Sequence, residues 1–228
     1  MREYVKTKGL ENILVPLLGK WDKVEDIDFE KLPNQFVIKT NHGSGDYIIV
    51  EDKLNININD IKKKIKHSLS TPYGLFQGEP HYLYIKPCVI AEPLLKQNST
   101  ISSSLIDYKV FCFNGEPNCI FCFHNRDDNH YEFELHDLNW DNHPEKLVFN
   151  DHSRDGKGKI PKPNLLDDLL SYARCLSSGF PQMRVDFYII GNTIYVSELT
   201  LTATGGHITY LTQTCLNELG NQIRLPKK

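Results

Sequence analysis

The residues best suited to chemistry lie in an otherwise apolar stretch, MRVDFYIIGNTIYVSELTL, at positions 183–201. The stretch predicts two strands joined by a turn at Gly191–Asn192. Alternation of side chains places Arg184 and Asp186 on one face of the first strand, and Glu198 and Thr200 on one face of the second. Residue 186 then pairs near 197 and residue 184 near 199. Within a slip of one residue, a cation and two acids converge on one surface.

Two carboxylates on neighbouring strands have a plain interpretation as part of a solvated face. The flanking residues are strongly apolar, however, so this surface is expected to be partly buried. Buried like charges repel unless a cation lies between them. Mg²⁺, which is bound by carboxylate and phosphate oxygens, would remove that repulsion.

A second polar segment separates two apolar runs in FVIKTNHGSGDYIIV, residues 36–50. Lys39 ends the first run, and a turn rich in glycine follows it. Glycines allow backbone N–H groups to approach an anion closely, and lysine adds a mobile charge, so the segment suits phosphate. It does not match the P-loop pattern GxxxxGK[ST]. The alternative is a long hairpin loop with an incidental lysine.

The elements that position these residues follow from periodicity and turn signals. Strands are expected at 36–39, 47–50, 82–95, 107–113, 118–124, 130–140, 183–190 and 193–201, and helices at 2–19, from an Asn59 cap to 70, and from an Asn164 cap to 178 with a stop at Gly179. Residues 150–164 read as a loop. The pattern predicts an α+β fold in two layers, with mixed or antiparallel sheets.

The six cysteines all lie in apolar segments. Cys119 and Cys122 form a CxxC, but no second ligand pair follows at the spacing of a structural zinc site. Cys112 and Cys119 flank a predicted turn and could oppose each other across a hairpin. Without a secretory signal we interpret all six as reduced, packed thiols, with zinc as the less favoured alternative.

Composition limits the classes of function. The formal net charge is −3, which gives no electrostatic case for nucleic acid or an anionic membrane. No run of about 18 apolar residues is present, and the N-terminus has no signal-peptide pattern. We therefore expect a cytoplasmic protein without a transmembrane segment.

Four motifs occur in the order KTNHGSG, VIAEPLL, DYKVFCFNGEP and RVDFYIIGNTIYVSELTLTATGG. Together they resemble the ATP-grasp superfamily, and within it the teichuronopeptide-biosynthesis (TupA-like) branch. The resemblance covers essentially the whole chain. It implies two α+β lobes with the nucleotide between them: a linker helix and connector at 1–33, a small lobe at 34–91 and a larger lobe at 92–228. The family's upstream N-terminal lobe is expected to be absent, shortened or supplied elsewhere.

The resemblance assigns the nucleotide to residues of the small lobe and the following hinge. Lys39 would bind the phosphates, and the next loop would cover them. Pro93 would accept a hydrogen bond from the adenine amino group, Leu95 would donate its N–H to the ring, and Glu92 would help to hold the base. The full set implied for ATP is Lys39, Asn41, His42, Gly43, Ser44, Gly45, Glu92, Pro93, Leu94 and Leu95.

The larger lobe would carry the catalytic groups. Arg184 is expected to stabilise the transferring phosphoryl group, with Lys109 beside the acyl phosphate. Asp186 and Glu198 are the implied Mg²⁺ ligands. Thr200 departs from the family's commoner ExN pattern, because a threonine hydroxyl is a shorter and weaker ligand than an asparagine amide.

The histidines are open to two interpretations. His42 either reaches a phosphate or an incoming amine, or fixes its loop through a backbone hydrogen bond, which we favour. His207 has a slightly better chance of facing substrate. His124 and His130 show no metal-ligand spacing and are expected at the surface.

The resemblance predicts an ATP- and Mg²⁺-dependent carboxylate–amine ligase that works through an acyl phosphate in cell-surface polysaccharide biosynthesis or modification. Its partners would be a small-molecule or saccharide carboxylate and an amine. The alternatives are a non-catalytic nucleotide-binding module, half of a split ligase, or a kinase of ATP-grasp type. A homodimer, or a partner chain supplying the N-terminal lobe, is a further alternative for assembly.

Overall fold

The computed structural model describes residues 1–74, 78–97 and 100–225. Contacts divide the chain into two compact units. The larger contains Met1–Leu14, Lys96–Ala203 and His207–Lys228, and the smaller contains Val15–Leu95 and Thr204–Gly206. Each unit has its own sheet and its own apolar core, so each is described by itself.

The smaller unit is built on an antiparallel sheet of strand order β1-β4-β2-β3. The strands are β1 (Gly19–Trp21), β2 (Phe36–Thr40), β3 (Tyr47–Val50) and β4 (Val89–Pro93). One face packs on α2 (Ile58–Ser70) through Phe36, Ile38, Ile61 and Ile65. The opposite face carries Lys39 and Glu92.

The larger unit is built on a sheet of order β10-β9-β5-β6-β7-β8. Its strands are β5 (Asp107–Phe113), β6 (Glu116–His124), β7 (Tyr131–His136), β8 (Ser153–Asp155), β9 (Gln182–Ile190) and β10 (Thr193–Thr200). Neighbours are antiparallel except β7 and β8, which are parallel. The remaining helices are α1 (Arg2–Thr7), α3 (Leu166–Ser177) and α4 (Gln213–Gly220).

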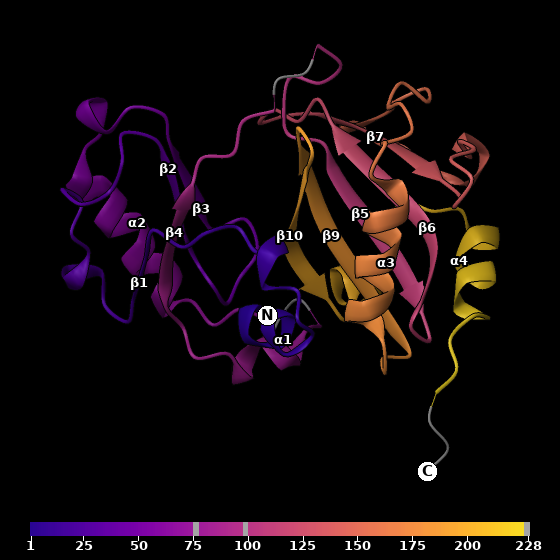
Figure 1. The fold of residues 1–228 in the computed structure, drawn as a ribbon, viewed down its shortest axis with the longest axis horizontal. Helices are drawn as coiled ribbons and strands as arrows, with labels where there is room; N and C mark the ends of the chain where they lie inside the picture. Colours follow the sequence, from indigo (N-terminus) through magenta and orange to yellow (C-terminus); the bar gives the residue numbers. More distant parts are fainter. Residues whose placement is uncertain (75–77, 98–99, 226–228) are drawn as a thin grey trace. The chain divides into compact units, whose positions relative to one another are not determined.

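Alternation gives the larger sheet two different faces. On one face α3 lies against β5, β6 and β9 (Figure 1), with Leu166, Leu169, Ala173 and Leu176 in the core. We call this the α3 face. The other face packs Phe111, Phe121 and Phe133 against Leu211 and Cys215, and Lys109, Arg184 and Asp186 lie on it. We call this the site face.

The helix expected at 2–19 is wrong. The α-helix ends at Thr7, a short 3-10 helix covers Glu11–Ile13, and residues 19–21 are a strand. Gly9, at φ +72°, turns the chain out of the helix, and Pro16 disfavours a helix beyond it. Two predicted caps also move: Asn57, not Asn59, accepts the first N–H groups of α2, and Leu165, not Asn164, precedes α3.

Two other expectations need correction. Of the strand predicted at 82–95, only Val89–Pro93 is extended in the sheet, since a 3-10 helix at Pro80–Tyr84 and Pro87 interrupt the segment. The loop predicted at 150–164 contains β8, which pairs with β7. Further short 3-10 helices cover Val24–Asp26, Lys53–Asn55 and Pro144–Lys146, and Ala203–Gly206 is a kinked turn in which Thr204 and Gly205 have positive φ.

All six cysteines are free thiols. Cys119 and Cys122 lie on opposite faces of β6, because three residues along a strand reverse the side, so the zinc alternative is wrong. Cys119 faces Phe111, not Cys112, across the hairpin. In residues 1–74, 78–97 and 100–225, no helix is long and apolar enough to cross a membrane.

Candidate active site

The predicted polar residues of the larger unit meet on the site face of β5, β9 and β10. Register pairs Lys109 with Asp186, Glu198 with Asp186, and Thr200 with Arg184. The sequence placed residues 186 and 184 opposite 197 and 199. A bulge in β10 between Val196 and Glu198 moves both partners by one residue, which is within the slip allowed.

Asp186 is the centre of this group. It is completely buried, and Arg184 donates to both of its oxygens, Nε to Oδ1 at 2.7 Å and Nη2 to Oδ2 at 2.7 Å. Lys109 Nζ donates to Oδ2 at 2.5 Å. Burial by itself would raise the pKa of Asp186, but Lys109 and Arg184 outweigh it and lower that pKa. Asp186 is therefore an anion whose partners, in the part of the chain that the structure describes, are cationic side chains.

Glu198 and Thr200 form the more open edge. The Glu198 side chain is 41% exposed, with Oε2 at 3.5 Å from Arg184 Nη2. Thr200 is buried and donates its hydroxyl to Glu198 Oε1 at 2.7 Å. Thr200 is thus paired with the neighbouring carboxylate, which the sequence did not predict.

Sequence reasoning missed Asp107, a further acid in this group. It lies two residues before Lys109 on β5, and its Oδ2 accepts from Lys109 Nζ at 2.6 Å. Asp107 is buried, and its Oδ1 has no hydrogen-bond partner among the described residues. Burial raises the pKa of Asp107, while Lys109 opposes that rise. The DYK motif could have revealed Asp107, since residues 107 and 109 lie on the same face of a strand.

We call Asp107, Lys109, Arg184 and Asp186 the acid–cation cluster. Lys109 is 13% exposed, and its Nζ also lies 5.7 Å from the centre of the Phe123 ring. Burial disfavours the charged amine, but the two carboxylates outweigh it and raise the pKa of Lys109. Two cations and two anions are thus held in one buried network, with Glu198 at its edge.

The oxygen donors of Asp186, Glu198 and Thr200 fit Mg²⁺. Asp186 and Glu198 supply carboxylate oxygens and Thr200 a hydroxyl, which are the hard donors that this ion prefers. The fit requires that Lys109 or Arg184 release an oxygen of Asp186. Among the residues that the structure describes, no three His, Cys, Asp or Glu form a metal-binding group by themselves. Phosphate oxygens would therefore have to complete the coordination.

In the smaller unit, Lys39 and Glu92 form an ion pair, with Lys39 Nζ at 2.8 Å from Glu92 Oε2. The lysine side chain is 33% exposed and that of the glutamate 11%. Both lie on the sheet face opposite α2. The structure thus brings together two of the predicted nucleotide residues. Pro93 ends β4, and Leu94 and Leu95 follow it, half-buried.

The loop after Lys39 is tied down at its start and open at its tip. Asn41 accepts from Cys88 N–H at 2.7 Å and donates to the Lys86 carbonyl at 3.0 Å. Ser44 and Gly45 are exposed, and Gly45 has φ +81°, which favours glycine. Gly43 passes close to Asp46, whose Oδ2 would lie 3.1 Å from an added Cβ.

One histidine departs from expectation. His42 is buried, and its Nδ1 has no hydrogen-bond partner among the described residues. His124, expected at the surface, is fully buried. His207 is exposed, and His130 is half-buried.

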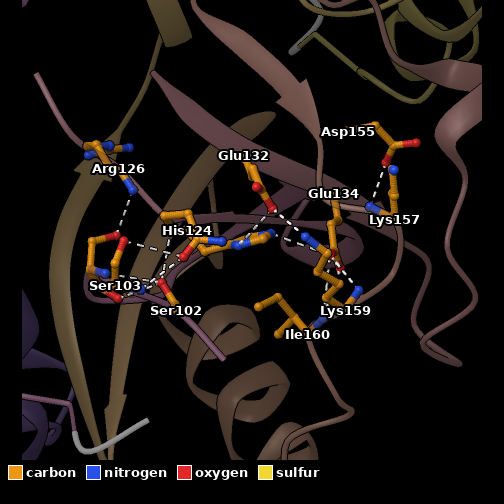
Figure 2. A network of polar contacts seen from close by, with 12 residues as sticks. Ser102, Ser103, His124, Arg126, Glu132, Glu134, Asp155, Lys157, Lys159 and Ile160 are labelled. Carbon is orange, nitrogen blue, oxygen red and sulfur yellow. Dashed lines mark hydrogen bonds and ion pairs between the residues drawn. The ribbon is translucent and has the colours of Figure 1, made fainter. Parts of the chain in front are cut away.

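His124 belongs to a second buried ionic group on the α3 face, shown in Figure 2. Glu134 is its centre: His136 Nε2 lies 2.8 Å from Oε2, and His124 Nε2 lies 3.4 Å from Oε1. The backbone N–H of Lys159 donates to Oε1 at 2.7 Å, and that of Ile160 approaches both oxygens at 3.4 Å. We call His124, Glu134 and His136 the imidazole–carboxylate cluster.

Comparison with known proteins identifies the family. The family model described as TupA-like ATPgrasp matches residues 1–224. The chain belongs to the TupA-like ATP-grasp family. The resemblance drawn from the sequence motifs is therefore confirmed, and so is the α+β fold class. No curated protein sequence gives a significant match.

Solved structures of ATP-grasp ligases share the fold. D-alanine–D-alanine ligase from Bacillus anthracis complexed with ATP has a TM-score of 0.52 at 16% identity, covering 96% of this chain and 57% of that one. Another structure of that ligase has a TM-score of 0.50 at 17% identity, covering 96% and 60%. The D-cycloserine synthetase DcsG gives 0.50 at 11%, covering 96% and 66%. The chain thus spans about 60% of the length of the ligase from Bacillus anthracis.

Proposed function

We propose that this chain is an ATP- and Mg²⁺-dependent ligase that joins a carboxylate to an amine through an acyl phosphate. The acid–cation cluster is the observation that carries the proposal. A TupA-like ATP-grasp chain that holds Lys109, Arg184 and Asp186 in one buried network has both the cations that phosphoryl transfer needs and a carboxylate for a metal.

In the first step, the substrate carboxylate attacks the γ-phosphorus of ATP, the bond to the β-phosphate oxygen breaks, and ADP leaves. Arg184 and Lys109 offset the negative charge on the transferring group. In the smaller unit, Lys39 is assigned to the nucleotide phosphates, and the loop of Asn41–Gly45 to covering them. Mg²⁺, held by Asp186 and Glu198 with Thr200 beside them, would neutralise phosphate charge and orient the oxygens.

In the second step, the amine attacks the acyl carbon and inorganic phosphate leaves, so that an amide forms. The amine loses a proton as the bond forms, and the departing phosphate can accept it. Adenine is assigned to Glu92, Pro93, Leu94 and Leu95 at the end of β4. The substrate class implied by the family is a uronic acid of a cell-surface polysaccharide, or an amino acid.

Product analysis tests the proposal. The chain is incubated with Mg²⁺ and ATP, a panel of uronic and amino acids, and a panel of amines. Phosphate and ADP release that requires both an acid and an amine, with an amide product by mass spectrometry, is expected. ADP with a phosphorylated hydroxyl would indicate a kinase. Nucleotide binding without any turnover would indicate a binding module.

The variant Lys39→Ala tests the role of the smaller unit. Removal of a cation that contacts phosphate should weaken Mg·ATP binding on the order of tenfold, the scale of one charge-assisted hydrogen bond. Lys64→Ala is the matched control, because Lys64 is an exposed lysine on α2. Calorimetry measures both. Equal affinities for the two variants would make Lys39 an ordinary surface lysine.

A further inference from the structure

Lys109 is shared by two carboxylates that are held in different ways. Its Nζ lies 2.5 Å from Asp186 Oδ2 and 2.6 Å from Asp107 Oδ2. Asp186 has Arg184 on both oxygens in addition. Asp107 has no second partner for Oδ1 among the described residues. One acid is therefore saturated with cations, while the other depends on Lys109.

This difference matters once a metal is bound. If Asp186 ligates Mg²⁺, as the proposed function requires, its oxygens turn to the ion and Lys109 loses that partner. Lys109 would then share a buried site with Arg184 and a divalent cation, and like charges in low dielectric repel strongly. A carboxylate is needed to hold the amine in place, and Asp107 Oδ2 already lies 2.6 Å from Lys109 Nζ.

We propose that Asp107 is a positioning residue, which holds Lys109 at the phosphate site while Asp186 is engaged by the metal. The inference rests on the proposed function and names a residue that it does not include. Asp107 acts through Lys109 and needs no contact with ATP.

The surroundings of Asp107 suit this role. It lies on the same strand as Lys109, two residues away, so the contact does not depend on β9. Tyr188 of β9 and Phe123 of β6 are its cross-strand neighbours, and both are half-buried aromatic residues. The charged groups that act on it are Lys109, Asp186 and Arg126, and the guanidinium of Arg126 lies over the Phe123 ring at 5.8 Å. Asp107 is thus a short, buried side chain with little room to move, while Lys109 has a long side chain that can reorient.

The test is a double-mutant cycle on nucleotide binding, with Asp107→Asn, Lys109→Met and the double variant. Calorimetry measures affinity for ATP with Mg²⁺, ATP with EDTA, and adenosine. Asp107→Asn should weaken binding of Mg·ATP on the order of tenfold, the scale of one charged hydrogen bond. Without Mg²⁺ the loss should be about twofold or less, because Asp186 still holds Lys109. Adenosine binding should not change.

In the Lys109→Met background, Asp107→Asn should have no further effect on ATP affinity. An equal loss in both backgrounds would overturn the proposal, because Asp107 would then contact the nucleotide or the metal directly. An equal loss with and without Mg²⁺, or no loss, would also overturn it. If the wild-type chain binds no ATP, the proposed function itself fails.

Control variants separate an effect on binding from an effect on folding. Asp168→Asn, an exposed acid on α3, is the matched control for loss of one carboxylate. If Asp107→Asn does not fold, Asp107→Glu takes its place, because it keeps the charge and displaces it by one methylene. In the presence of Mg²⁺, Asp107→Glu should bind ATP more weakly than wild type does. An unchanged affinity would show that the position of the carboxylate beside Lys109 does not matter, and would overturn the proposal.

Discussion

The two faces of the six-stranded sheet each bury an ionic cluster, and the two clusters are held in opposite ways. On the site face, the partners of Asp186 among the described residues are the side-chain cations Lys109 and Arg184. On the α3 face, Glu134 accepts from the backbone N–H of Lys159 and lies beside His124 (Figure 2). Its other oxygen contacts His136. Burial and charge are common to both, so neither property alone marks a functional site.

The two clusters differ in the kind of group that holds the central carboxylate. Long cationic side chains can turn to a ligand, whereas a backbone N–H cannot leave without moving the chain. Glu134 therefore fixes the segment after β8 to the sheet. The close fit at Gly156 supports this, because an added Cβ would lie 2.5 Å from both Glu134 Cγ and His124 Nε2. The proposed function requires the acid–cation cluster to exchange partners, whereas the imidazole–carboxylate cluster holds the chain after β8 to the sheet.

The largest expected effect is on the site face. Glu198→Gln should lower Mg²⁺-dependent turnover at least a hundredfold, since it removes a charge at a metal and phosphate site. Stability should change by less than about 0.5 kcal/mol, because the side chain is 41% exposed and an amide oxygen can still accept from Thr200. Kinetics and thermal unfolding measure the two quantities.

Glu218→Gln is the matched control for Glu198→Gln, because Glu218 is half-exposed and also paired with one cation, Lys146, at 3.1 Å. Asp186→Asn is a less clean test. It should also abolish turnover, but it leaves Lys109 and Arg184 buried with less compensation and should cost stability. Wild-type turnover in Glu198→Gln would contradict the metal assignment.

On the α3 face we expect the opposite: loss of the buried carboxylate should lower stability and leave nucleotide binding unchanged. Burial would raise the pKa of Glu134, but its imidazole and backbone partners lower it from the ordinary 4.5 to about 2. A folded pKa below the unfolded one stabilises the protein above pH 4.5, and this contribution is lost as pH falls toward 2. It amounts to about 3 kcal/mol at neutral pH.

Glu134→Gln should therefore lower the free energy of unfolding by about 3 kcal/mol at pH 7, and the difference from wild type should close near pH 2. Nucleotide affinity below the transition should be unchanged. Glu116→Gln is the control, since Glu116 is exposed and pairs with Arg174 at the surface, where about 1 kcal/mol or less is expected. Denaturant unfolding across pH measures both, and a pH-independent difference would contradict the ionic origin.

The comparison also shows what the sequence could predict. Alternation along 183–190 and 193–201 was enough to place Arg184, Asp186 and Glu198 together, because strand faces depend only on local order. The bulge that moves Glu198 opposite Asp186 was allowed for but not located. Asp107 was visible beside Lys109, yet its importance depends on a third strand distant in sequence.

His124 and the N-terminal helix were predicted wrongly. His124 has the spacing of the buried Ile120 and Cys122 on β6, but its polar type suggested the surface. Its burial depends on Glu134 of the next strand, which no local pattern reveals. The helix predicted at 2–19 followed scattered apolar positions and overlooked Gly9, the local stop signal.

The smallest expected effect concerns Thr200, at the boundary between a site residue and a strand residue. Its hydroxyl donates to Glu198 Oε1 at 2.7 Å, and the residue is 4% exposed. Thr200→Val keeps the shape and removes this donor, so apparent Mg²⁺ affinity should fall a few-fold, the scale of about 1 kcal/mol for one hydrogen bond. Thr200→Asn restores a donor and adds an amide oxygen, so affinity should hold or rise. If Thr200 is only a β-branched strand residue, Val is neutral and Asn is the harmful change, because asparagine disfavours strands. A Mg²⁺ titration of ATP turnover ranks the variants by apparent Mg²⁺ affinity.

The same titration of Thr200→Val in the Glu198→Gln background tells how Thr200 acts. No further loss of affinity means that Thr200 orients Glu198, and an additional few-fold loss means that its oxygen reaches the metal. If Thr200→Val has the Mg²⁺ affinity of wild type and Thr200→Asn has a lower one, Thr200 is not a residue of the metal site.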